Sequence, residues 1–176
     1  RMGGGYIRTY NNSGRETSYL GTGSDNSGQL RIYDKQGETR SYIGDGYLQA
    51  YNQFGERTIF LGTGTNGGGY LRTYNFSGQE SIYVGTGADS SGQIRIYDNS
   101  GETGSFLGSG YFRTYNKFGK LTTFVGNASD GGGYLRTNNK FETETVFLGT
   151  NNANEGLINL NDKFGQSFWI RLNKKN

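Results

Sequence analysis

Arginine and tyrosine recur two positions apart along this chain and form its most regular set of polar side chains. A guanidinium carries a fixed positive charge, and a phenol offers both a hydroxyl and a ring. An exposed ladder of such pairs has the chemistry to bind an acidic or neutral glycan. It is more typical of a solvated sheet face, where arginine stems lie along tyrosine rings and pair with glutamates such as Glu16, Glu38, Glu56, Glu80 and Glu102. The ladder residues are Arg8, Tyr10, Arg31, Tyr33, Arg72, Tyr74, Arg95, Tyr97, Arg113 and Tyr115.

No other group of residues indicates catalysis. The chain has no histidine, the commonest general base, and no cysteine. Almost every polar residue recurs with the repeat, whereas a catalytic site is a unique constellation. The departures from the repeat (Phe112, Lys120, Leu121, Glu142 and the C-terminal end) form no acid–base pair. We therefore predict that the protein is not an enzyme and assign no catalytic residues.

Two glycine-rich loops, at 21–28 and 85–92, contain aspartate and serine, which are oxygen ligands of the kind that calcium takes. Each loop has only one carboxylate, so turn formation explains its composition. We assign no metal site and no cofactor.

The composition excludes an ordinary globular domain. Hydrophobic residues make up 31% of the 176 residues, whereas aromatics reach 15%, and there are 32 glycines and no proline. The net charge of +3 is spread among both signs, so we expect no nucleic-acid partner. No apolar run reaches the roughly 18 residues of a membrane span, and we expect no membrane insertion. Because the chain begins with Arg1-Met2, we expect it to be part of a longer or processed protein.

The chain is one array of eight repeat units. The unit reads G-x-(aliphatic)-R-x-Y-N-x-x-G, followed by a second apolar stretch that ends aromatic-aliphatic-Gly. The spacings between units follow the order 23, 18 and 23 residues, so three units make a superperiod of 64. The eighth unit differs, and we interpret 157–176 as an altered terminal repeat with a cap at Phe168–Leu172 and a frayed tail. The units start near Gly5, Gly28, Gly46, Gly69, Gly92, Gly110, Gly133 and Gly156.

Each unit is predicted to form two strands joined by a tight turn. Aliphatic and Arg/Tyr positions alternate with period two, which places Leu71 on one face and Arg72 and Tyr74 on the other. The Asn/Asp-x-x-Gly segments between the strands are typical of type I turns. We expect positive φ at the last residue of these turns, namely Gly14, Gly37, Gly55, Gly78, Gly101 and Gly119. Residue volumes also trade off between the strands: Ile32 and Ile96 occur with Ser41 and Ser105.

The superperiod of three favours three chains wound about one axis. In a homotrimeric, intertwined triangular β-helix, each unit lies on one face of a prism and partner chains fill the layers between units. Such a narrow interior needs only the one or two aliphatic residues that each strand supplies. A single-chain β-solenoid is the alternative for this elongated all-β array.

The "GGYLRTYN…YVGTG" units resemble those of intertwined trimeric β-helix shafts in phage tail fibres, tailspikes and related adhesive fibres. The "YNxxGxxT" pattern also resembles the tyrosine–aspartate repeats of toxin shells, although their usual Arg-Tyr-x-Tyr-Asp core is absent. The resemblance to fibres implies a structural shaft or adhesive segment on a virion, an appendage or another extracellular surface. Its partners would be two further copies of the chain and a surface glycan. A monomeric carbohydrate-binding solenoid is one alternative, and a glycan-cleaving fibre enzyme is a second.

Overall fold

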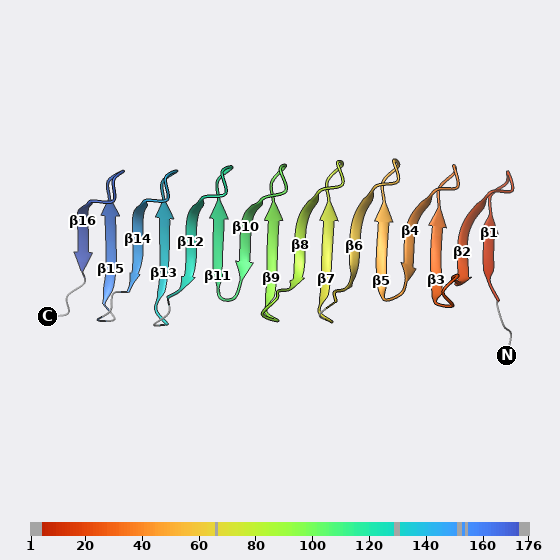
Figure 1. The fold of residues 1–176 in the computed structure, drawn as a ribbon, viewed down its shortest axis with the longest axis horizontal. Coiled ribbons are helices and arrows are strands. Elements are labelled where there is room, and N and C mark those ends of the chain that lie inside the picture. Colours follow the sequence, from red (N-terminus) through yellow and green to blue (C-terminus); the bar gives the residue numbers. More distant parts are fainter. Residues whose placement is uncertain (1–4, 66, 129–130, 151–152, 154, 173–176) are drawn as a thin grey trace. The chain divides into compact units, whose positions relative to one another are not determined.

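Each half of the chain folds into an antiparallel meander of eight strands (Figure 1). The computed structural model describes residues 5–65, 67–128, 131–150, 153 and 155–172, with side chains up to residue 168. The first unit spans Arg1–Ser90 and the second Ser91–Asn176. The strands of the first unit are β1 (Ile7–Tyr10), β2 (Glu16–Thr22), β3 (Gly28–Tyr33), β4 (Thr39–Gly44), β5 (Tyr47–Tyr51), β6 (Arg57–Thr63), β7 (Gly69–Tyr74) and β8 (Glu80–Thr86). Those of the second are β9 (Gly92–Tyr97), β10 (Thr103–Gly108), β11 (Tyr111–Tyr115), β12 (Leu121–Asn127), β13 (Gly133–Asn138), β14 (Glu144–Thr150), β15 (Gly156–Asn161) and β16 (Ser167–Leu172).

Within each unit, every strand pairs with its neighbours in sequence, and the sheet stays open. The prediction of an all-β repeat built from hairpins is confirmed. The pairing also continues from one hairpin to the next: β2 pairs with β3 through Leu20 and Leu30, and β6 with β7 through Leu61 and Leu71. Strands of successive hairpins are therefore hydrogen-bonded to each other within one chain, where the intertwined arrangement would place strands of partner chains.

The register lines up one apolar residue on each strand from β1 to β8 and from β9 to β15, whereas β16 has Arg171 opposite Ile158. Leu61, for example, lies opposite Leu48 on β5 and opposite Leu71 on β7. Because side chains alternate across a strand, these residues share one face, which we call the apolar face. The apolar row consists of Ile7, Leu20, Leu30, Ile43, Leu48, Leu61, Leu71 and Val84 in the first unit, and of Ile94, Leu107, Phe112, Val125, Leu135, Leu148 and Ile158 in the second.

A second row on the apolar face explains the volume trade-off seen in the sequence. Ile32 lies directly opposite Ser41, and Ile96 lies opposite Ser105. Thr73 likewise faces Ile82. A large residue beside a small one keeps the height of the face even, as in a surface that packs against another.

The hairpin turns have the predicted geometry. In the first of them, the Gly14 amide donates to the Asn11 carbonyl at 3.0 Å, and the Asn11 side chain accepts from the amides of Ser13 and Arg15. In the turn after β9, the Ser100 hydroxyl donates to Asp98 and lowers the pKa of that carboxyl. All six expected glycines have positive φ, between 71° and 90°: Gly14, Gly37, Gly55, Gly78, Gly101 and Gly119.

The turns between hairpins explain the two repeat spacings. Asp45 and Gly46 both have positive φ, as do Ser109 and Gly110. Two successive residues with positive φ fit a two-residue type I′ turn, the tightest hairpin connection. Where this two-residue turn joins two hairpins, the repeat spacing is 18 residues. Where a longer loop such as 23–27 joins them, the spacing is 23 residues.

Replacing Gly78 with valine is expected to lower the free energy of unfolding by about 1–3 kcal/mol, because a β-branched residue at φ 74° is strained. In the equivalent turn after β13, this position is occupied by Glu142 in place of glycine, with φ 66°. The Glu142 carboxylate lies 2.7 Å from Nζ of Lys120. Chemical denaturation of the variant and of the unmodified protein measures the difference. An unchanged unfolding midpoint would mean that this turn does not require a left-handed residue.

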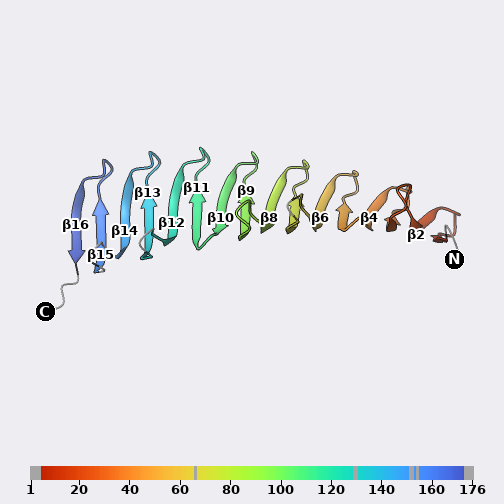
Figure 2. The same cartoon turned by 60° about the horizontal axis from the view of Figure 1, so that its bottom comes forward.

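Neither unit buries a conventional core. Among the described residues, Phe124 is the one apolar residue classed as buried, at 5% exposure, and in each unit no further element covers either face of the sheet (Figures 1 and 2). Each sheet is therefore a single layer with both faces open.

The C-terminal end is described in part. β16 pairs with β15 in register, with Ser167 opposite Asn161, so the altered repeat is still a hairpin. Phe168 is 68% exposed. The tail predicted for 173–176 lies outside the described residues. No helix in the described part of the chain could span a membrane.

Candidate functional site

The Arg–Tyr ladder lies on the face opposite the apolar row, where it is joined by aromatic residues that the sequence analysis had not placed there. Arg72 lies opposite Phe60 on β6 and Tyr83 on β8. In the second unit, Arg113 lies opposite Phe106 and Phe124. The sequence shows an aromatic residue before each aliphatic-Gly pair. Its position opposite an arginine could not be predicted, because that position depends on the register between strands. We call this surface the Arg–aromatic face.

The aromatic rings stack along each sheet across successive strands. In the first unit the stack is Tyr42, Tyr47, Phe60, Tyr70 and Tyr83, with ring centroids 5.1–5.8 Å apart. In the second it is Phe106, Tyr111, Phe124, Tyr134 and Phe147, with centroids 4.7–5.6 Å apart. Tyr6 and Tyr19 form a shorter stack at 6.1 Å. Such pairs add about 0.5–1.5 kcal/mol each beyond their burial.

Several glycines inside the strands, among them Gly62, Gly85 and Gly126, make room for these aromatic residues. A Cβ on Gly62, Gly85 or Gly126 would lie 2.4–2.8 Å from an atom of a stacked aromatic residue. Strands β6, β8 and β12 therefore continue through their glycine, where the sequence had indicated the start of a loop. In the aromatic-aliphatic-Gly motif, the side chain of Phe60 or Tyr83 thus extends over the glycine two residues later on its own strand.

The ladder arginines cover the rings. The guanidinium of Arg72 lies 4.7 Å from the Tyr70 centroid, and that of Arg113 lies 4.2 Å from the Tyr111 centroid. Arg8 and Arg31 lie over Tyr6 and Tyr42, at 4.5 and 5.6 Å. Each such cation–π contact contributes about 0.5–1 kcal/mol at an exposed site. The arginines therefore have a structural role, whatever else they bind.

Two of the predicted glutamates pair with ladder arginines. Arg8 Nε lies 3.5 Å from Glu16, and Arg72 Nε lies 3.3 Å from Glu80. A hydrogen bond with Tyr10, followed by attraction to Glu16, raises the pKa of the Arg8 guanidinium. Partial burial opposes the charged form of Arg72, but Glu80 and Tyr74 outweigh it and raise the pKa.

The ladder tyrosines are less uniform than the arginines. Tyr10 is 56% exposed, whereas Tyr33, Tyr74, Tyr97 and Tyr115 are half-buried. Tyr74 lies beneath the guanidinium of Arg57, at 4.6 Å. The structure thus brings three ladder pairs (at Arg8, Arg31 and Arg72) onto one face of the first unit, and two (at Arg95 and Arg113) onto one face of the second.

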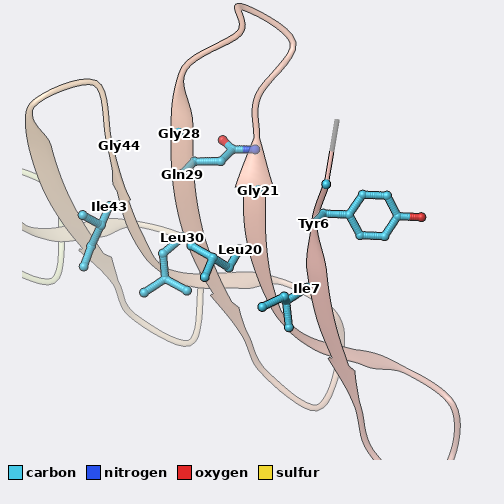
Figure 3. Close-up of a pocket in the computed structure, with 10 residues that line it drawn as sticks. Tyr6, Ile7, Leu20, Gly21, Gly28, Gln29, Leu30, Ile43 and Gly44 are labelled. Atoms are coloured by element: carbon cyan, nitrogen blue, oxygen red, sulfur yellow. The ribbon is translucent and has the colours of Figure 1, made fainter. Parts of the chain in front are cut away.

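The apolar face carries hollows of its own. One, of about 580 Å³, lies over β1–β4 and is lined by Ile7, Leu20, Leu30 and Ile43. Figure 3 shows these four side chains along the strands, with the Tyr6 ring turned away from them. A second hollow of about 860 Å³ is lined by Leu48, Leu61, Leu71 and Val84. Both are open troughs beside the apolar row.

The aspartate of the first glycine-rich loop holds the loop together. Asp25 accepts hydrogen bonds from the amide and the hydroxyl of Ser27, at 3.1 and 2.8 Å, and these bonds lower the pKa of the carboxyl. No cluster of three or more metal-type side chains occurs among the residues whose positions are described.

Comparison with known proteins gave little. No protein family and no curated protein matches the chain. Among solved structures, the chain is similar to part of the Photorhabdus luminescens Tc holotoxin pore carrying the TccC3-D651A mutation. The two are 12% identical over 89% of this chain, the TM-score is 0.26, and the chain spans 12% of the length of that one.

Proposed function

We propose that the chain is a structural segment of a homo-oligomeric fibre, in which further copies of the chain cover the apolar face. The observation that carries this proposal is the unbroken apolar row on an uncovered face. Leu20, Leu61 and Leu107 are each about half exposed, at 51%, 50% and 49%. A surface of this kind marks an interaction site or promotes aggregation.

The exposure of the apolar row agrees with an interface. Ile7 and Ile43 in the first unit are 64% and 46% exposed, and Leu148 in the second is 48% exposed. The even height of the second row, with Ile32 beside Ser41, suits packing against another flat sheet.

Three copies are the number we propose, as the resemblance to trimeric fibre shafts implies. Because successive hairpins pair within the chain, the partner copies would meet it through the apolar face and not by inserting strands between hairpins. The Arg–aromatic face would then point outward, as the adhesive surface of a shaft. The stacked rings would stiffen the layer along its length.

Labelling of a single cysteine tests which face is covered, because the chain has no cysteine of its own. Leu61→Cys places a thiol on the apolar row, where the isolated chain leaves leucine 50% exposed. Phe76→Cys, in a turn where phenylalanine is 85% exposed, is the control. We expect the thiol at position 61 to react with a maleimide at least about tenfold more slowly than the thiol at 76 in native buffer. Equal rates would remove the support for a covered apolar face.

A further inference from the structure

A third hollow lies on the Arg–aromatic face of the second unit, away from the apolar row. Its volume is about 380 Å³, within the range of small-ligand sites. Its walls include two ladder arginines, Arg95 and Arg113, together with Tyr111 and Tyr115. Thr103 and the exposed side chain of Glu102 complete the turn end of the hollow.

The repeat shows which pairing carboxylate is missing beside the two arginines, although Glu102 lines the turn end of the hollow. In hairpin β1–β2, Glu16 lies opposite Tyr10 and pairs with Arg8; in β7–β8, Glu80 lies opposite Tyr74 and pairs with Arg72. The equivalent residue in β9–β10 is Thr103, opposite Tyr97. The chain therefore supplies an internal carboxylate to two ladder arginines but not to Arg95.

Arg113 also lacks a glutamate from the neighbouring strand. The residue opposite Tyr115 is Leu121, which cannot pair with a guanidinium. Nε of Arg95 and Arg113, like that of Arg72 and Arg136, is buried and has no hydrogen-bond partner among the described residues. Gln93 accepts a hydrogen bond from Nη2 of Arg95 at 3.3 Å, as Gln29 does from Nη2 and Nε of Arg31. Two guanidinium groups that lack the carboxylate of their counterparts thus border one hollow.

We propose that this hollow binds the carboxylate of one acidic sugar residue. The carboxylate would lie between Arg95 and Arg113, where the internal glutamate is missing, and charge-assisted hydrogen bonds to arginine are the strong kind. Glu102 and Tyr115 would bind ring hydroxyls, because one accepts and the other both donates and accepts. The site is independent of the proposed assembly, since every wall residue belongs to one chain.

Titration of the unmodified protein with D-glucuronate, followed by the amide shifts of residues 95–119, tests this site. D-Glucose tests the need for the carboxylate, and acetate tests the need for the sugar. We expect glucuronate to bind at least about tenfold more tightly than either, in keeping with a charge-assisted pair. Equal affinity for acetate would overturn the assignment to a sugar, and the absence of any saturable glucuronate shift would overturn the site.

Matched variants locate the binding. Thr103→Glu supplies the missing carboxylate from within the chain, as Glu80 does for Arg72, and is expected to weaken glucuronate binding at least about tenfold. Thr39→Glu makes the same change at the equivalent place in β4 and should leave the affinity unchanged. Arg113→Gln copies Gln49 of the first unit and should weaken binding to a similar degree. Full affinity in Thr103→Glu, with folding intact, would contradict the proposal.

Discussion

Replacing Leu71 with aspartate is expected to dissociate the assembly into monomers. Leu71 lies in the apolar row between Leu61 and Val84, so a carboxylate there would face the partner chains. The lost apolar burial is about 1.5–3 kcal/mol per copy, and an unpaired charge in a covered interface costs several kcal/mol more. Size-exclusion chromatography with light scattering measures the mass, and circular dichroism reports whether strands persist.

The opposite face supplies the control. The double variant Arg72→Ala with Tyr74→Ala removes ladder groups and should leave the assembly intact. Its cost is expected to be about 1–2 kcal/mol, because Arg72 contacts Tyr70 and Tyr83 and pairs with Glu80. If the double variant dissociated while Leu71→Asp stayed assembled, the two faces would be assigned the wrong way round.

Replacing Gly126 with alanine is expected to destabilise the second unit by about 1–3 kcal/mol, the usual cost of overpacking. A Cβ at this position would lie 2.4 Å from Cβ of Tyr111 and 2.9 Å from its Cα, so backbone would have to move. Tyr111 sits between Phe106 and Phe124 in the ring stack, and its displacement would disturb both neighbours. Thermal unfolding followed by near-UV circular dichroism measures the loss of stability and of ring packing.

Gly133→Ala is the matched control for this change. Gly133 begins the adjacent strand β13, has no positive φ, and would meet no atom within 4 Å on gaining a Cβ. Its replacement should alter the melting temperature little. A loss of stability at position 133 as large as that at 126 would show that the effect is general to strand glycines and not caused by the close approach of Tyr111 to Gly126.

The features that the sequence predicted well are local. Positive φ at Gly78 follows from its place as the fourth residue of an Asn-x-x-Gly turn. The placement of Leu71 and Arg72 on opposite faces follows from strand geometry. Both depend on residues within one hairpin, so one repeat unit carries the whole signal.

The ring stack and the hollow at Arg95 were not predicted, because both depend on register between strands. The sequence contains Phe60, Gly62 and Tyr70, but only the pairing of β6 with β7 places the Tyr70 ring beside Phe60. The pairing of Ile32 with Ser41 was visible as a trade of volumes, whereas its position on an open face was not. The missing carboxylate at Thr103 emerges only when its place is compared with that of Glu80 in an equivalent hairpin.

The mass of the unmodified protein in native buffer tests the central claim most directly. Light scattering on a dilution series should give about 58 kDa, three times the chain mass of 19.4 kDa, with little dependence on concentration. A uniform species at 19.4 kDa across that series, with the strands still folded, would contradict an apolar face covered by further copies of the chain.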